Sequence, residues 1–137
     1  MREPLIFDTS VWVDFLNKKT TQEALLLQEY ILADDEVLLV PTILQEILQG
    51  IREDSTYNHI KEALSFFRLL ELPAYEVAVG GADLYRSLRK HGITIRKSND
   101  CLIAYYAIRF SVSIAHIDRD FDQISKQSDL KVLKFDR

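Results

Sequence analysis

The chain has 137 residues, of which 47% are hydrophobic and 28% charged, a composition typical of one soluble globular domain spanning residues 1–137. Its formal net charge of −4 argues against a module that only binds nucleic acid, because such modules are usually basic, but not against an enzyme that acts on nucleic acid. The single cysteine excludes an internal disulfide, and no apolar run approaches the roughly 20 residues that span a bilayer. We therefore expect a cytoplasmic protein without a membrane partner.

The first third of the chain alternates short apolar runs with helical patterns. Three apolar residues run directly into Asp8, and the later run of four apolar residues ends at Pro41, which suits the first turn of a helix. Thr20 or Thr21 can cap the intervening helix, and Gly50 ends the last one. In chain order, the sequence predicts a strand at 5–7, helices at 11–16 and 21–32, a strand at 37–40 and a helix at 41–49.

The rest of the chain continues the alternation after a block of helices. Helical spacing of apolar residues covers two long segments, the second of which ends at Gly92. In chain order, the sequence predicts helices at 57–70 and 75–91, a short connection at 93–95, a helix that begins at Ser98, a strand at 112–115, a short helix that begins at Asp118 and a strand at 131–135. Four strands that alternate with helices predict an α/β fold with a parallel sheet covered on both faces.

Acidic side chains fall where the predicted strands end. Asp8 follows the first strand, Glu46 lies on the helix entered from the second, and Asp118 follows the strand at 112–115. Asp100 lies in the first turn of the helix before that strand. Because open α/β sheets bind ligands outside the carboxyl ends of their strands, we expect these four side chains to meet at one edge.

Taken singly, each acid has a plain structural explanation. Asp8, Asp100 and Asp118 can cap helix N-termini, and Glu46 suits a solvated helix flank. Four acids at one sheet edge would nevertheless repel one another unless a cation held them. Oxygen ligands without a Cys–His set at zinc spacing favour Mg²⁺, with Mn²⁺ as an alternative, and Mg²⁺ held by acids in an α/β protein most often handles phosphate esters.

Four segments together resemble the PIN-domain ribonucleases, and among them the VapC toxins of prokaryotic toxin–antitoxin pairs. Asp100 and Asp118 are 18 residues apart, a spacing typical of that family. The segments, each of which resembles one acidic motif of the family, are Phe7–Trp12, Ile43–Gly50, Asn99–Ala104 and Ile117–Phe121. The resemblance extends over nearly the whole chain and implies a PIN-like three-layer α/β/α fold around a mainly parallel sheet of four to five strands.

The resemblance also implies the residues of the site. It assigns catalysis to Asp8, Glu46, Asp100 and Asp118, and the metal to Asp8, Asp100 and Asp118. Accessory roles fall to Thr9, Ser10, His116 and Asp120, and contacts with the RNA backbone to Arg96 and Lys97. The chain departs from the family pattern at His116, where the family commonly has a threonine or serine two residues before the fourth acid.

The implied activity is endonucleolytic cleavage of RNA, with tRNA or rRNA as the substrate. A metal-activated water would attack in line and leave a 5′-phosphate and a 3′-hydroxyl, and no histidine is needed as the base. The implied partners are a VapB-like antitoxin and a second copy of the chain in a homodimer.

Two alternatives stay open on the sequence. One is another metal-dependent phosphate enzyme, either another nuclease, such as a DNA nuclease, or a small phosphatase. A phosphatase with an aspartyl nucleophile would have a second aspartate two residues after Asp8, where this chain has Ser10. The other is a catalytically weak PIN domain that only binds RNA or a protein; its mark would be the loss of the acids, and all four are present.

Overall fold

The computed structural model describes residues 1–135 and contains a parallel sheet of five strands in the order β3-β2-β1-β4-β5. The expected domain at 1–137 includes residues 136 and 137, which lie outside the described range. The strands are β1 (Leu5–Phe7), β2 (Val37–Leu39), β3 (Arg68–Leu69), β4 (Ser113–Ala115) and β5 (Lys131–Val132). The expected parallel α/β fold is confirmed.

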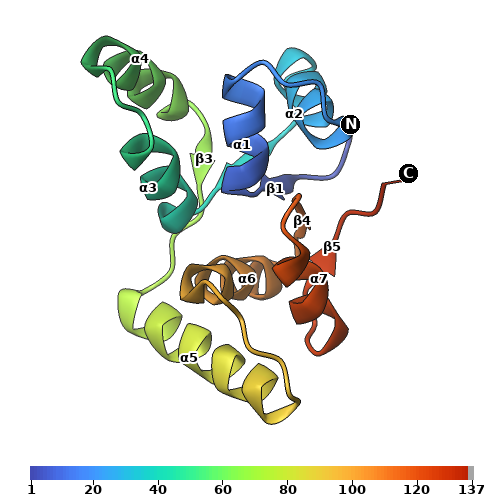
Figure 1. Ribbon diagram of the computed structural model, residues 1–137. Coiled ribbons are helices and arrows are strands. Elements are labelled where there is room, and N and C mark those ends of the chain that lie inside the picture. Colours follow the sequence, from blue (N-terminus) through green and yellow to red (C-terminus); the bar gives the residue numbers. More distant parts are fainter. Residues whose placement is uncertain (136–137) are drawn as a thin grey trace.

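Helices cover both faces of the sheet and make the expected three layers. Helices α1 to α4 lie on one side and α5 to α7 on the other (Figure 1). None of the helices within residues 1–135 combines the length and apolarity that crossing a membrane requires. The helices are α1 (Thr9–Leu16), α2 (Gln22–Leu32), α3 (Pro41–Gln49), α4 (Asp54–Leu64), α5 (Ala74–Lys90), α6 (Ser98–Phe110) and α7 (Arg119–Lys126).

Strand β1 is the centre of the sheet and of the core. Its three apolar residues are buried, and it pairs with β2 on one side and β4 on the other. Phe7 is in register with Ala115, and the N–H of Asp8 donates to the carbonyl oxygen of Ala115 at 2.9 Å. The strand order turns back between β1 and β4, so the chain leaves these adjacent strands toward opposite faces, an arrangement that opens a crevice in α/β sheets.

Helices α5 and α6 approach closely through two glycines. A Cβ atom at Gly80 would overlap the ring of Tyr105, and one at Gly81 would lie 2.8 Å from a methyl group of Leu102. Polar contacts also join the two helices: the Tyr105 hydroxyl donates to Glu76 Oε2 at 2.7 Å, and Arg109 Nε lies 3.0 Å from the same oxygen. The glycines thus let α5 rest directly on α6, which carries Asp100.

The predicted helix at 57–70 is wrong in its second half. Helix α4 ends at Leu64, and the chain then forms the edge strand β3, where the N–H of Leu70 donates to the carbonyl oxygen of Leu39 at 2.8 Å. Phe67 is apolar because its ring packs edge-on against Trp12, with centroids 5.5 Å apart. Its position in the sequence happens to continue the apolar spacing of the helix. The last strand is also shorter than the expected 131–135 and ends at Val132.

Candidate active site

Asp8 occupies the turn between β1 and α1. Its carboxylate caps α1, with Oδ2 accepting from the N–H of Ser10 at 3.2 Å and from the Ser10 hydroxyl at 2.7 Å. The side chain is buried, and this burial raises the pKa of Asp8 above its ordinary value, although the bonds from Ser10 act in the opposite direction. The capping explanation therefore holds for Asp8, but a burial that disfavours the charged carboxylate goes beyond what a cap requires.

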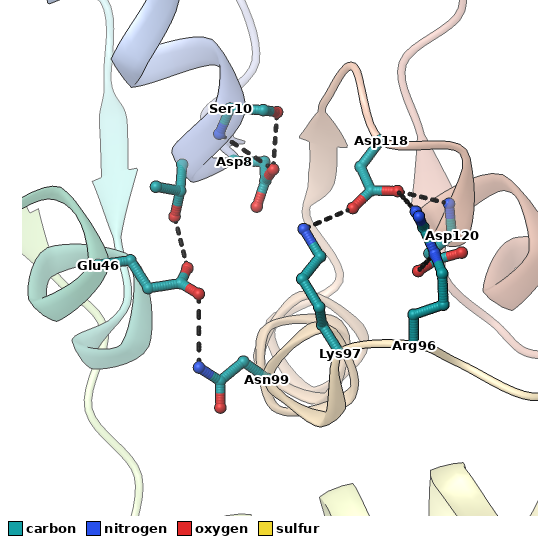
Figure 2. Close-up of polar contacts among 9 residues, drawn as sticks. Asp8, Ser10, Glu46, Arg96, Lys97, Asn99, Asp118 and Asp120 are labelled. Carbon is teal, nitrogen blue, oxygen red and sulfur yellow. Dashed lines mark hydrogen bonds and ion pairs between the residues drawn. The ribbon is translucent and has the colours of Figure 1, made fainter. Parts of the chain in front are cut away.

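Glu46 points toward Asp8 from helix α3. Thr9 Oγ1 donates to Glu46 Oε1 at 2.6 Å, and Asn99 Nδ2 lies 3.4 Å from Oε2. These partners come from the first turns of α1 and α6, so two helix starts meet at this carboxylate from the middle of α3 (Figure 2). After burial, the charge of Glu46 is a smaller cause that raises the pKa of Asp8.

Asp100 is a second buried acid with a raised pKa. It is 3% exposed, and burial, followed by the charge of Asp8, raises its pKa to about 7. Its Oδ2 atom is buried and accepts no hydrogen bond from any group in residues 1–135. A buried carboxylate oxygen without a donor is costly, and such an atom in a polar crevice is a candidate ligand position.

Asp118 and Asp120 form the other side of the crevice, after β4. Asp118 caps α7 by accepting from the N–H of Asp120 at 3.0 Å, and it accepts from Lys97 Nζ, whose nitrogen is 2.9 Å from Oδ2. Burial acts to raise the pKa of Asp118, but these two hydrogen bonds outweigh it and hold the pKa below its ordinary value. Arg96 lies against both acids, 3.5 Å from Asp118 Oδ1 and 3.4 Å from Asp120 Oδ2.

The acids meet as one site with two sides. Carboxylate oxygens of Asp100, Asp118 and Asp120 all lie within 4.8 Å of one another. A cleft of about 410 Å³ opens on the other side, lined by Asp8, Thr9, Ser10, Val13, Asp14, Glu46, Gln49, Lys97 and Asp100. Asp100 and Lys97 belong to both sides and join them. Figure 2 shows the Lys97 side chain rising between Asp8 and Asp118.

These residues fit a divalent cation. The donors are hard carboxylate oxygens, which Mg²⁺ and Mn²⁺ prefer. One of them, Asp100 Oδ2, is buried and finds no hydrogen-bond donor among the described residues. Mutual repulsion among the acids contributes to the raised pKa of Asp100, and a bound cation would reverse that contribution.

The ion pair and the ring contact of His116 are with residues of α7, and its accessory role stays a prediction. Its Nε2 atom lies 3.2 Å from Asp122 Oδ1, and its ring stacks at a tilt on Phe121, with centroids 5.3 Å apart. The imidazole is buried, and both of these partners lie on α7, the helix that Asp118 caps.

The structure brings the four predicted acids together and adds detail that the sequence did not predict. Asp120, expected as an accessory, lies as close to Asp100 and Asp118 as a ligand would. Asn99 was not predicted as part of the site, although its place beside Asp100 at a helix start was a usable signal. Asp14, also not predicted, lines the cleft and lies 3.7 Å from Lys19.

Comparison with known proteins points to one family. The family model for the PIN domain matches residues 5–127. The VapC ribonuclease Mb1587 of Mycobacterium bovis is 31% identical over 133 residues, which cover 96% of this chain and 98% of the relative. Ribonuclease VapC11 of Mycobacterium tuberculosis matches with the same identity and coverage.

Solved structures share the fold. VapBC2 from Rickettsia felis, bound to a DNA fragment from its promoter, superposes with a TM-score of 0.75 at 17% identity, covering 98% of this chain and all of the other. FitAcB from Neisseria gonorrhoeae superposes with a TM-score of 0.69 at 22% identity, covering 95% of this chain and 96% of the other.

Proposed function

This chain belongs to the PIN domain family, and from that membership and its acidic site we propose that it is a Mg²⁺-dependent endoribonuclease, the toxin of a type II toxin–antitoxin pair. The proposal takes residues 1–137 as a single PIN-like domain. The observation that carries it is the meeting of Asp8, Glu46, Asp100 and Asp118 at the crevice between β1 and β4, where a buried oxygen of Asp100 has no donor in the part of the chain that the structure describes.

The residues of the site have different proposed roles in the reaction. Asp8, Asp100 and Asp118 would hold the Mg²⁺ ion, with Mn²⁺ as a substitute, and Asp120 lies beside them as an accessory acid. When bound, the ion would lower the pKa of water and offset charge on the scissile phosphate. Ser10 orients Asp8 through its two hydrogen bonds, and Thr9 orients Glu46. The expected products carry a 5′-phosphate and a 3′-hydroxyl.

RNA is the proposed substrate, with tRNA or rRNA as the RNA class. The names of the two mycobacterial relatives, both ribonucleases, support an RNA substrate. Arg96 and Lys97, at the rim of the acids, are the proposed contacts with the RNA backbone, because their side chains are 63% and 59% exposed.

A VapB-like antitoxin and a second copy of the chain are the proposed protein partners. Several solved structures with this fold are VapBC complexes, which supports the antitoxin. Large apolar side chains stay exposed on several elements, among them Val13, Phe66, Tyr75 and Ile117. Such surface is a common mark of protein contacts.

The decisive experiment incubates the purified protein with total tRNA and rRNA, with Mg²⁺ or with a chelator. We expect cleavage that requires Mg²⁺ and disappears in the Asp8→Asn variant. The matched control is Asp83→Asn, the same atomic change at an exposed residue of α5, which should cleave as the unmodified chain does. Cleavage in chelator, or equal cleavage by Asp8→Asn, would contradict the mechanism.

A cellular test addresses the partner. Expression should arrest growth, and coexpression of the neighbouring gene product should relieve the arrest. A chain that binds RNA tightly, but neither cleaves it nor arrests growth, would be a non-catalytic PIN domain.

A further inference from the structure

Arg96 and Lys97 are engaged with the acids of the site itself. Lys97 Nζ is 2.9 Å from Asp118 Oδ2, while Arg96 spans Asp118 and Asp120 with contacts of 3.5 and 3.4 Å. Both side chains leave the segment just before α6 and lean back over the acids (Figure 2). Two positively charged side chains therefore lie against Asp118 and Asp120, which form one corner of a site whose carboxylates also fit a divalent cation.

The acids of this corner are nearly buried, whereas the two cations are not. The side chains of Asp118 and Asp120 are 10% and 9% exposed, against 63% for Arg96 and 59% for Lys97. The acids are fixed by the α7 turn, so the pairs can open only by movement of the long, solvated basic side chains. The basic partner of each pair is highly exposed, so water and salt can solvate it when the pair opens, and the α7 turn need not change.

We propose that Arg96 and Lys97 are internal counter-ions that compete with the divalent cation for Asp118 and Asp120, and that binding of this cation releases them to bind the RNA backbone. The proposal rests on the proposed function and deepens it, because it links the two ligands of the site. A cation that binds Oδ2 of Asp118 displaces Lys97 Nζ from this oxygen. The displaced ammonium group can then pair with another anion. A phosphate of the RNA supplies one.

Reciprocal coupling follows from this exchange. If the cation raises the affinity for RNA by freeing the two side chains, RNA must raise the affinity for the cation by the same factor. The same residues should therefore weaken cation binding when RNA is absent and strengthen RNA binding when the cation is present. A simple phosphate contact would have only the second effect.

Arg119 provides a matched control within the same corner. It is exposed, lies between the two acids in sequence and lines one hollow together with Arg96 and Asp120. Within residues 1–135 it makes no ion pair with either acid. Replacing Arg119 by glutamine removes one positive charge near the site without removing a counter-ion, so it isolates the general effect of charge.

The first test measures binding of Mg²⁺ and Mn²⁺ by titration calorimetry, without RNA, in the full chain. Lys97→Gln and Arg96→Gln should each bind the cation at least about fivefold more tightly than the unmodified chain, the lower end of usual coupling factors, while Arg119→Gln should change the affinity less than twofold. Lys97→Arg, which keeps the charge, should bind like the unmodified chain. Unchanged affinity in the first two variants, or an equal gain in Arg119→Gln, would overturn the proposal.

The second test measures the affinity for a short labelled RNA by fluorescence anisotropy, with and without Ca²⁺, and checks on a gel that the RNA stays intact. The cation should raise the RNA affinity of the unmodified chain and of Arg119→Gln, and the rise should be several-fold smaller in Lys97→Gln. An equal rise in all three would refute the release of the side chains. The two tests do not depend on catalysis: absent cleavage with a calorimetric shift would reject the proposed function alone, and cleavage without the shift would reject this inference alone.

Discussion

The Thr9 hydroxyl donates a hydrogen bond of 2.6 Å to Glu46 Oε1 and so joins the first turn of α1 to the middle of α3. The two residues lie 37 positions apart, but their helices follow β1 and β2, which are neighbours in the sheet. The bond holds the Glu46 carboxylate on the side of Asp8. Position 9 thus acts on the chemistry through Glu46, which makes Thr9 a positioning residue.

Replacing Thr9 by valine should reduce cleavage without unfolding the chain. Valine keeps the shape but removes the donor, and a hydrogen bond to a charged group contributes about 1.5–3 kcal/mol. We expect kcat/KM for RNA cleavage to fall by about tenfold or more. Thr9→Ser, which keeps the hydroxyl, should retain most of the activity. A loss as large in the serine variant would show that the methyl group, and not the bond, matters.

Stability should fall as pH rises toward neutrality when divalent cations are removed. The pKa of Asp100 is raised from 3.8 to about 7, so between these values the folded chain binds more protons at this site than the unfolded chain. The free energy of unfolding therefore decreases across that window, and the penalty is complete above pH 7. The pKa of Asp8 is also raised, so Asp8 contributes with the same sign.

Urea unfolding in chelator at pH 5 and pH 7.5 measures this effect. The upper bound for Asp100 is on the order of 4 kcal/mol, from about 1.4 kcal/mol per pKa unit. Asp100→Asn should flatten the profile, and Asp83→Asn should not. Parallel profiles for Asp100→Asn and the unmodified chain would show that the Asp100 carboxyl does not titrate in this window.

Gly80→Ala should destabilise the chain although alanine favours helices. The new Cβ overlaps the Tyr105 ring, which must move and weaken its hydrogen bond to Glu76. We expect a loss of about 1–3 kcal/mol in the free energy of unfolding, after a propensity gain of about 1 kcal/mol. Gly50→Ala is the control, because a Cβ there meets only ordinary contacts of 3.5 and 3.6 Å at a negative φ of −81°. It should be neutral or slightly stabilising in the same denaturation assay.

His116 should contribute to stability mainly through packing. His116→Ala removes the buried ring from Phe121 and should cost about 1–3 kcal/mol, whereas Asp122→Ala, at a half-exposed partner, should cost less than about 1 kcal/mol. A double-mutant cycle by chemical denaturation gives the coupling between the two. If both single variants lost the same free energy of unfolding, and the coupling energy were as large as either loss, the stability would come from the His116–Asp122 pair instead.

The parts of the fold that follow from local patterns were predictable from the sequence. Apolar runs that end in an acid indicated β1 and the turn after it, and Pro41 and Gly50 bracketed α3. Strand β3 was not predictable, because its two residues lie between Phe67 and Leu70, which continue the apolar spacing of the helix before them. Its backbone is extended because it pairs with the free edge of β2. This pairing is a tertiary contact, which the local sequence pattern does not reveal.

The four acids of the site were predictable as a group, and their neighbours were not. The rule that ligands bind at the carboxyl ends of strands gathers Asp8, Glu46, Asp100 and Asp118. This rule does not give the direction of a side chain. The closeness of Asp120 to Asp100 and the pairing of Lys97 with Asp118 therefore could not be predicted from the sequence.

The central place of β1 determines when the site can form during synthesis. One of the two neighbours of β1, strand β4, is made about a hundred residues after β1 itself. The carbonyl of Ala115 that receives the N–H of Asp8, and the turn that carries Asp118, do not exist in the nascent chain until then. A nascent chain that ends before β4 therefore has no assembled site, so the proposed nuclease activity could begin only after β4 and the turn after it have left the ribosome.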